Sequence, residues 1–477
     1  MHTFLWHDYE TFGINTRTAR PAQFAAIRTD EQLNEIGEPI EIFCQPAPDF
    51  LPEPQACLIT GITPQHCLKV GLPEHEFTEQ IFKALSQPNT IGVGYNSIRY
   101  DDEITRFMFW RNLIEPYSRE WQNGCSRWDI IDLARVTYAL RPEGIIWPRN
   151  EQGRISFKLT NLTEVNHIAH EAAHDALSDV RATIALARLI KNKQPKLFDF
   201  YFNLRQKDQV ANEIGLHLNP RQPFLHLSSM YPPERAHLAL VYPLALHPSN
   251  KNEVIVWDCA YDPSELFELD AETIQKRMFT RADELPDGMT RLPIKTIHTN
   301  KSPVVIRSLK VLDAAAQQRC GLDLALNLHH AAIAADKISG VDLSLVWQQV
   351  FQREFELGDV DESLYSGFLG NNDRNLLNQL RALTPQALAQ ARPNFTDARL
   401  TELLFRYRAR NYPETLSEDE YDLWQQHCAE RLHGGAAGAL NFETFFAELE
   451  RCAQNEAANV DVLQSLRDYA YMIAPES

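Results

Sequence analysis

The sequence predicts an α/β protein in which a mixed sheet with flanking helices comes first, a smaller β-rich part follows and a helical part ends the chain. Three observations support this order. Early hairpin-like strands give way to strand–helix alternation, short strand candidates amid frequent prolines come next, and long amphipathic stretches come last. The expected segments are 1–192, 195–350 and 352–477.

The first segment contains β-rich runs and two helical stretches. Four strands are expected, at 3–11, 23–29, 39–45 and 90–96. The last of them leads into a helix expected at 102–113, and a second helix at 175–191 has its apolar residues at helical spacing on one face. Pro195 and its polar neighbours then break the pattern and mark the first boundary.

The second segment has the sequence pattern of short strands, whereas the third has that of amphipathic helices. Strands of the second segment are expected at 225–227, 239–242, 253–257 and 304–306. Helices of the third are expected at 400–410, 418–431 and 442–453. A chain of 477 residues, 44% of them hydrophobic, has enough apolar material for two to four domains.

Charge and composition exclude several classes of protein. A formal charge of −18 argues against coating nucleic acid by bulk electrostatics, so a protein that binds DNA would have to concentrate its positive charge locally. No run of about 18 apolar residues and no signal-peptide pattern occur, which predicts no membrane association and a cytoplasmic location. Eight scattered cysteines without a C-x-x-C pair disfavour a zinc site and predict free thiols.

Asp8 and Glu10 are the first candidates for chemistry. They stand two apart in a strand-like run, so their side chains point to the same face. Two like charges on a mostly apolar strand need a cation, and a pair of Mg²⁺ ions about 3.5–4 Å apart prefers carboxylate oxygens. Such a pair can hold the attacking and leaving oxygens of a phosphodiester, which makes phosphodiester hydrolysis the function to test.

Asp101 supplies a third carboxylate. It follows the buried-looking strand at 90–96, at the carboxyl end where sheet-based sites tend to lie. The adjacent Asp102 is the competing candidate, and we expect it to cap the following helix instead.

His174 and Asp179 complete the set. If Asp175 caps the helix at 175–191, Asp179 lies inside that helix, fixed for metal coordination, and His174 lies in the preceding turn. A neutral histidine, with an ordinary pKa near 6.5, can take the proton of an attacking water. We therefore expect a rigid ligand and a mobile base from one short segment.

The run from His170 to His174 also matches the H-E-x-x-H pattern of zinc proteases. That pattern requires both histidines on one helix and a third ligand downstream. Asp175 is expected to start the helix after the pair, and no glutamate occurs between His174 and Glu213. We therefore interpret His167 and His170 as ordinary surface or turn histidines.

Three short motifs resemble those of the DEDDh subclass of DnaQ-like 3′→5′ exonucleases: Asp8-x-Glu10, Asn96-x-x-x-Tyr100-Asp101 and His174-x-x-x-x-Asp179. The resemblance implies a ribonuclease H-like fold in the first segment. It also implies that Asp8, Glu10, Asp101 and Asp179 bind two Mg²⁺ ions, with Mn²⁺ able to substitute. Glu10 would also lie near the terminal 3′-hydroxyl, and His174 would be the general base.

Longer stretches resemble the bacterial exonuclease I family: 7–13, 20–28, 58–64, 139–145 and 407–411. This resemblance covers nearly the whole chain. It implies a Src-homology-3-like barrel in the second segment, a helical third segment, and a clamp around single-stranded DNA. The implied activity removes nucleotides from the 3′ end and releases 5′-monophosphates, in DNA repair and recombination and with single-strand DNA-binding protein as a partner. A monomer is expected because one chain already supplies three domains.

Basic and aromatic residues between the second and third motifs suit a single-strand track. The preferred DNA contacts are Arg106, Tyr117, Trp121, Arg135 and Lys158. Trp128 is more typical of a core residue, and residues 58–62 could either wedge against terminal bases or pack as a turn. Further candidates for phosphate contact are Lys301, Arg406, Arg408 and Arg410. A solvated helix face explains the last three equally well.

Two alternative functions stay open. An exoribonuclease of the same superfamily shares the motifs, although the long extension after the first segment favours a DNA clamp. A non-catalytic repair adaptor that only holds DNA is the other alternative, and the intact set of carboxylates argues against it.

Overall fold

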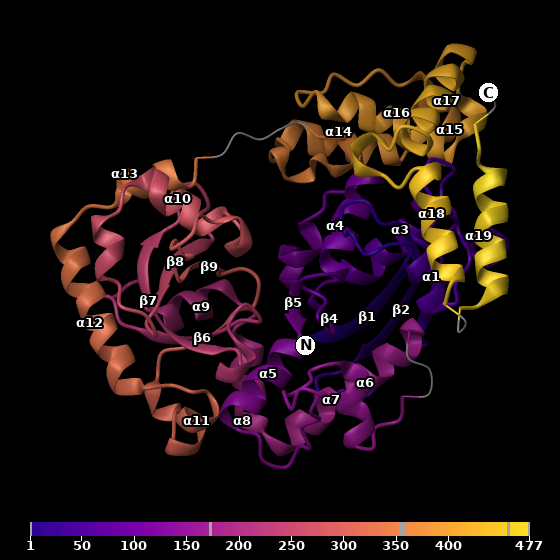
Figure 1. Cartoon of the computed structure of the whole chain (residues 1–477). Coiled ribbons are helices and arrows are strands. Elements are labelled where there is room, and N and C mark those ends of the chain that lie inside the picture. The colour runs from indigo at the N-terminus through magenta and orange to yellow at the C-terminus, as the bar shows by residue number, and fades with distance from the viewer. Residues whose placement is uncertain (1, 171–173, 353–357, 456–457, 476–477) are drawn as a thin grey trace. The chain divides into compact units, whose positions relative to one another are not determined.

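The computed structural model describes residues 2–170, 174–352, 358–455 and 458–475 (Figure 1). The chain divides into two compact units. Unit 1 consists of Met1–Ser126, His170–Arg181 and Phe355–Ser477. Unit 2 consists of Arg127–Ala169 and Ala182–Glu354.

Unit 1 is built on a mixed five-stranded sheet in the order β3-β2-β1-β4-β5. Its strands are β1 (Thr3–Thr11), β2 (Pro21–Thr29), β3 (Ile40–Phe43), β4 (Thr90–Gly94) and β5 (Ser126–Asp129), where the chain passes into unit 2. The central strand β1 pairs antiparallel with β2 and parallel with β4. Nearly every residue of β2 and all of β4 are buried, which is typical of a sheet covered on both faces.

The helices of unit 1 come from both ends of the chain. They are α1 (Pro54–Thr60), α2 (Pro64–Val70), α3 (Glu74–Leu85), α4 (Asp101–Arg111), the start of α7 (Ala176–Lys193), α14 (Asn371–Arg381), α15 (Pro385–Gln390), α16 (Arg399–Asn411), α17 (Glu418–Leu432), α18 (Phe442–Ala453) and α19 (Val460–Met472). Helices α18 and α19 pack on α1. One apolar cluster joins Phe12 and Leu51 to Trp424, Leu449 and Leu466, so the C-terminal helices share a core with the N-terminal sheet region.

A buried network of ion pairs reinforces this union. We call it the Asp49–Asp361 network, and its members are Arg20, Asp49, Asp359, Asp361, Arg406, Arg410 and Arg431. Arg410 binds Asp49 at 2.7 Å and also binds Asp361. Because both carboxylates are almost fully buried, each needs these cations to stay charged.

Unit 2 contains an antiparallel sheet in the order β10-β6-β7-β8-β9. Its strands are β6 (Phe224–Leu227), β7 (Leu238–Leu246), β8 (Glu253–Asp258), β9 (Ile294–His298) and β10 (Val304–Ile306). Its helices are α5 (Ile130–Leu140), α6 (Leu159–Val165), the rest of α7, α8 (Pro195–Asn203), α9 (Lys207–Ile214), α10 (Ala271–Phe279), α11 (Ala314–Arg319), α12 (Leu324–Gly340) and α13 (Ser344–Val350). The four strands expected in this part of the chain are present.

Two strands were not expected from the sequence, β5 and β9. Both are short, and β9 is mostly half-buried, so its side chains carry a weak hydrophobic signal. The expected helices match closely in the C-terminal part, where α18 has the anticipated bounds. All eight cysteines are free and buried.

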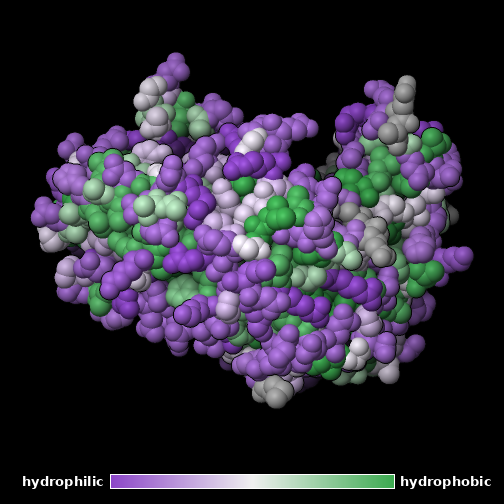
Figure 2. All heavy atoms as spheres, turned by 90° about the horizontal axis from the view of Figure 1, so that it is seen from below, coloured by the Kyte–Doolittle hydropathy of each residue, from purple (hydrophilic) through white to green (hydrophobic). Residues whose placement is uncertain are grey.

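The surface drawn in Figure 2 is mostly hydrophilic, with hydrophobic residues in small groups between polar ones. Among the residues that the structure describes, no helix is both long and apolar enough to cross a membrane.

Candidate active site

Strand β1 presents two carboxylates on one face. Asp8 and Glu10 are separated by Tyr9, and the pleat of the strand directs their side chains the same way. Glu10 is 9% exposed and Asp8 is half-buried. No lysine or arginine in the described part of the chain forms an ion pair with either of them.

Asp101 joins this pair from the first turn of α4. The Tyr9 N–H donates to Asp101 Oδ1 at 3.2 Å, which fixes this buried carboxylate beside β1. The preceding strand β4 ends at Gly94, where a Cβ would lie 2.7 Å from the Ser97 Cβ and 2.9 Å from the His7 carbonyl. A glycine is therefore required for the close approach that carries the chain from β4 into α4.

Asp102 does not cap α4, which corrects the expectation from the sequence. The helix begins at Asp101, and Tyr100 occupies the capping position without a side-chain cap. The Asp102 carboxylate is buried and pairs with Arg119 at 2.5 Å. Asp102 is thus neutralised by an arginine, and Asp101 is the carboxylate that faces β1.

Asp179 and His174 enter from the start of α7. Asp175 caps this helix as expected, because its Oδ2 accepts the Ser178 N–H at 3.0 Å. Asp179 follows one turn later, and its N–H donates to the Asp175 carbonyl. His174 has φ +66°, a left-handed conformation that brings its exposed side chain out of the helix direction.

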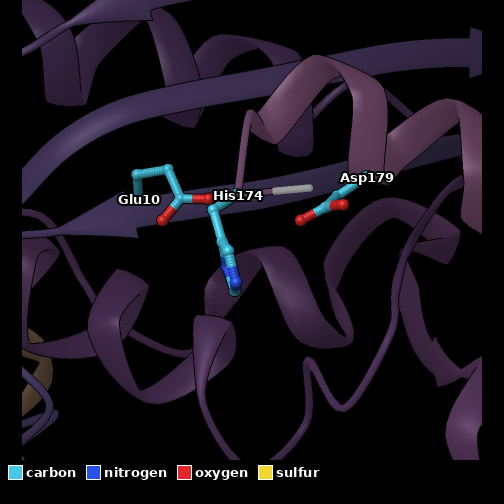
Figure 3. A group of neighbouring side chains, drawn as sticks. All are labelled: Glu10, His174 and Asp179. Atoms are coloured by element: carbon cyan, nitrogen blue, oxygen red, sulfur yellow. The ribbon is translucent and has the colours of Figure 1, made fainter. Parts of the chain in front are cut away.

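These segments bring together a possible metal-binding group. Ligand atoms of Glu10, His174 and Asp179 all lie within 4.8 Å of one another. Figure 3 shows Glu10 coming from strand β1 and Asp179 from helix α7, with His174 beside them. Residues separated by more than 160 positions in the sequence thus meet at one place in unit 1.

The electrostatics of the site indicate a cluster of carboxylates whose negative charges lie close together. Burial and the neighbouring charges of Asp101, Glu10 and Asp179 raise the pKa of Asp8 well above its usual value. Burial, followed by the charges of Asp179 and Asp101, raises the pKa of Glu10 to about 8. Burial also raises the pKa of Asp179, although the hydrogen bond from His170 opposes the shift. Clustered carboxylates with raised pKa values are typical of sites that bind cations.

His170 is not the ordinary surface or turn histidine that we expected. Its side chain is only 6% exposed, and its Nε2 is bound to Asp179 Oδ1. Residues Glu171, Ala172 and Ala173 of the H-E-x-x-H pattern lie outside the described residues. Helix α7 begins at Ala176, after His174, so the described residues do not place the two histidines of that pattern on one helix.

The five expected DNA contacts differ in how exposed their side chains are and in whether they are already paired. Trp121 is 64% exposed, and Lys158 is also exposed. Tyr117 is half-buried, with its ring 6.0 Å from that of Phe368. Arg135 is mostly buried and pairs with Asp132 at 2.8 Å.

Arg106 does not offer a free cation to DNA. It is 3% exposed, and its guanidinium binds both oxygens of Glu120, at 2.7 and 2.9 Å. It also pairs with Glu103 at 2.5 Å and lies 5.3 Å from the centre of the Tyr117 ring. Arg106 therefore supports Tyr117 and the turn around it, and its burial and pairing disfavour the direct DNA contact that the sequence predicted.

Two further expectations are resolved by burial. Trp128 is fully buried against Phe198, Tyr201 and Phe202, as a core residue should be. Residues 58–62 end α1, and Leu58 and Ile62 pack on an apolar core cluster, which favours the packed turn over a wedge.

Neither reading of the arginines of α16 was right. Arg406 and Arg410 belong to the Asp49–Asp361 network, and Arg408 pairs with Glu420 at 2.7 Å. All three are buried, so they form neither a solvated face nor phosphate contacts.

Comparison with family models assigns the whole of this arrangement to one class of protein, the exonucleases. The family model described as "Exonuclease" matches residues 5–187. The models described as "Exonuclease I SH3-like domain" and "Exonuclease I C-terminal domain" match residues 205–353 and 358–473. The chain belongs to the exonuclease I family, as its motifs predicted.

Individual relatives are similar over nearly the whole chain. Exodeoxyribonuclease I of Haemophilus influenzae is 41% identical over 471 residues, which are 98% of each chain. The crystal structure of Escherichia coli exonuclease I in complex with a dA16 oligonucleotide has a TM-score of 0.93 at 40% identity, and the match covers 99% of this chain and 100% of the other. The predicted fold class is therefore confirmed.

Two further solved structures of exonuclease I contain bound partners. One is the zinc ion bound form of the E. coli exonuclease I complex with single-stranded DNA, with a TM-score of 0.89 at 39% identity. The other is a complex of exonuclease I with single-strand DNA-binding protein (SSB) and an inhibitor, with a TM-score of 0.89 at 38% identity. Each match covers 99% of this chain and 100% of the other. One of these solved proteins thus binds a zinc ion and single-stranded DNA, and the other binds SSB.

Proposed function

We propose that this protein is a 3′→5′ exonuclease that degrades single-stranded DNA to 5′-mononucleotides. The observation that carries the proposal is the meeting of Asp8, Glu10, Asp101, His174 and Asp179 in unit 1. Membership of the exonuclease I family supports both the reaction and the substrate.

The carboxylates Asp8, Glu10, Asp101 and Asp179 would hold two Mg²⁺ ions. The fit is supported by the donor set, which offers oxygen ligands to a hard cation, and by the pKa values of Asp8 and Glu10, which burial and, after it, neighbouring carboxylates raise. When bound, the ions supply Lewis-acid stabilisation of the attacking and leaving oxygens. Mn²⁺ offers the same oxygen-seeking chemistry and is expected to substitute.

His174 is the proposed general base. Its exposed side chain, in the turn before α7, can reach the water that attacks the terminal phosphodiester and take its proton. Glu10 lies beside it and would orient the terminal 3′-hydroxyl. Replacing His174 with Asn, which tolerates a positive φ, should lower the hydrolysis rate by about 10²–10⁴-fold. An unchanged rate at neutral pH would show that His174 is not the base.

The single strand would be bound by aromatic faces and a few cations. Tyr117 and Trp121 are the proposed stacking residues of unit 1, and the exposed Phe368 beside Tyr117 extends their surface. In unit 2, the exposed Lys158 is the main proposed phosphate contact, and Arg135 would contribute by exchanging its Asp132 partner for a phosphate. The excess of acidic residues means that binding depends on these few local groups.

Three finer features of the protein are part of the proposal. SSB is the expected protein partner, since a solved relative contains it. The protein acts as a cytoplasmic monomer in DNA repair and recombination. Its domains are 1–192, 195–350 and 352–477, and the ranges of the three family models support these boundaries.

End-labelled oligonucleotides test the activity directly. A strand labelled at its 5′ end should shorten one nucleotide at a time with Mg²⁺ and stay intact with a chelator. Duplex DNA and a matched RNA strand are the controls for strand preference and sugar preference. Preferred hydrolysis of RNA would favour the exoribonuclease, and binding without hydrolysis in Mg²⁺ or Mn²⁺ would favour the non-catalytic adaptor.

A further inference from the structure

The Asp179 carboxylate has a neighbour that the proposed mechanism does not use. His170 Nε2 is bound to Asp179 Oδ1, and the histidine side chain is 6% exposed while that of Asp179 is 19% exposed. An ionised carboxylate can only accept hydrogen bonds, so the shared proton belongs to His170 Nε2. The contact therefore fixes both the tautomer of the histidine and the direction of the carboxylate.

Local structure explains why Asp179 needs such a partner. Its backbone is held in α7 by its N–H bond to the Asp175 carbonyl, at 3.0 Å, but the direction of the carboxylate is set by hydrogen bonds from the His170 side chain and from the His174 backbone. The acidic neighbours of the site repel it, as the effect of the Asp179 charge on Glu10 shows. The hydrogen bond from His170 to Oδ1, together with the one from the His174 backbone, holds the carboxylate in place against this repulsion, and an ionised carboxylate has further lone pairs with which to bind a cation.

We propose that His170 is a positioning residue for metal binding: its Nε2–H holds Asp179 in the orientation in which this carboxylate ligates a divalent cation together with Glu10. The inference rests on the proposed function and deepens it. Hydrogen-bonded partners of ligating groups commonly change metal affinity by 10–100-fold when they are removed. His170 touches neither the DNA nor the reacting atoms in this role.

Two substitutions distinguish the effect of the His170 hydrogen-bond donor from the effect of the size of its side chain. His170→Phe keeps a planar ring of similar size but removes the donor, whereas His170→Gln keeps an N–H donor at the same reach. The control is His167→Asn, which changes an exposed histidine three residues earlier and suits its positive φ of 56°. Thermal unfolding of each variant reports whether the fold is retained.

The first measurement is Mn²⁺ binding to the full-length protein without DNA, by calorimetry or electron paramagnetic resonance. We expect His170→Phe to weaken Mn²⁺ binding by about 10–100-fold, and His170→Gln and His167→Asn to stay within about threefold of the original protein. The second is the metal concentration that gives half-maximal hydrolysis. It should rise by a similar factor in His170→Phe, while the rate at saturating metal recovers.

The outcomes distinguish this inference from the proposed function. If the unsubstituted protein neither binds Mn²⁺ nor cleaves DNA, the proposed function fails. If it does both and folded His170→Phe binds Mn²⁺ as tightly as it does, the positioning role is wrong. Equal weakening by His170→Phe and His170→Gln would also overturn it, because the donor would then not be what matters.

Discussion

Unit 1 contains two groups of buried acidic residues that behave in opposite ways. In the active-site cluster, Asp8 and Glu10 have no arginine or lysine partner among the described residues, and their pKa values are raised. In the Asp49–Asp361 network, burial alone would raise the pKa of Asp361, but the charges of Arg410 and Arg20 lower it well below its ordinary value. Aspartates in the Asp49–Asp361 network are thus neutralised by arginines of the protein, whereas Asp8 and Glu10 in the active-site cluster could be neutralised by a bound metal ion.

The difference separates function from stability. A buried carboxylate that is paired with arginine contributes to folding, and removing one partner leaves an uncompensated charge. A cluster of neighbouring carboxylates opposes folding through mutual repulsion, and this unfavourable interaction is relieved when a cation binds. Four predictions test whether the two groups divide in this way.

The largest effect is expected from Asp8→Asn. Loss of this carboxylate should reduce hydrolysis by about 10³-fold or more, equivalent to at least about 4 kcal/mol of transition-state stabilisation. The metal-free protein should be as stable as before or more so, because one repelling charge is gone. Single-turnover hydrolysis and urea unfolding measure the two effects. Ordinary turnover by this variant would overturn the assignment of the site.

Asp361→Asn should show the reverse pattern. Breaking a buried ion pair commonly costs about 3–5 kcal/mol, and here it leaves Arg410 and Arg406 short of a partner. We expect a lower urea midpoint and near-normal hydrolysis per folded molecule. Asp422→Asn, at an exposed position of α17, is the matched control and should change neither. If the Asp361→Asn variant were stable but inactive, the Asp49–Asp361 network would serve catalysis and not stability, contrary to our prediction.

The pH dependence of stability should differ with and without metal. The pKa of Glu10 rises from about 4.5 unfolded to about 8 folded, so its protonated form favours the native state and that contribution is lost as pH rises from about 5 to 8. We expect the metal-free protein to lose about 2–4 kcal/mol over this range. Asp361, whose pKa is lowered, keeps its contribution throughout this range and loses it only in stronger acid.

Thermal unfolding at pH 5 and pH 8, with chelator and with Mg²⁺, measures this effect. Saturating Mg²⁺ should remove most of the decrease at pH 8, since the cation replaces the proton as the neutralising charge. Glu10→Gln should flatten the pH dependence of the metal-free protein. An equal decrease in the presence and absence of Mg²⁺ would mean that the acidic cluster is not the source.

The two groups also differ in how far the sequence could predict them. Asp8 and Glu10 stand two apart on a strand, and Asp175 is a recognisable cap, so local rules placed these residues correctly. The pairing of Arg410 with Asp49 joins positions 361 apart and follows no local pattern. The fold class and most strands were predictable because burial imposes a period on the sequence.

Missed features share one physical cause. Asp102 was expected to cap α4 because aspartates at the start of a helix often cap it. His170 was expected to be an ordinary surface or turn residue because most histidines are at least partly exposed. In the folded chain Asp102 instead pairs with Arg119, and His170 pairs with Asp179. The sequence positions of such partners follow no periodic pattern, so these tertiary ion pairs and hydrogen bonds cannot be predicted from residue spacing.

The smallest effect tests the consequence for DNA binding. Because the arginines of α16 are paired with carboxylates, exposed aromatic rings should contribute more to single-strand affinity in unit 1 than these cations do. Trp121→Ala should weaken binding of a DNA oligomer by about 1–3 kcal/mol. Tyr421→Ala, which removes another half-exposed ring, and Arg408→Gln should have little effect. Fluorescence anisotropy with catalytically inactive Asp8→Asn as the background measures all three, and a larger loss from Arg408→Gln than from Trp121→Ala would show that paired arginines still serve the DNA.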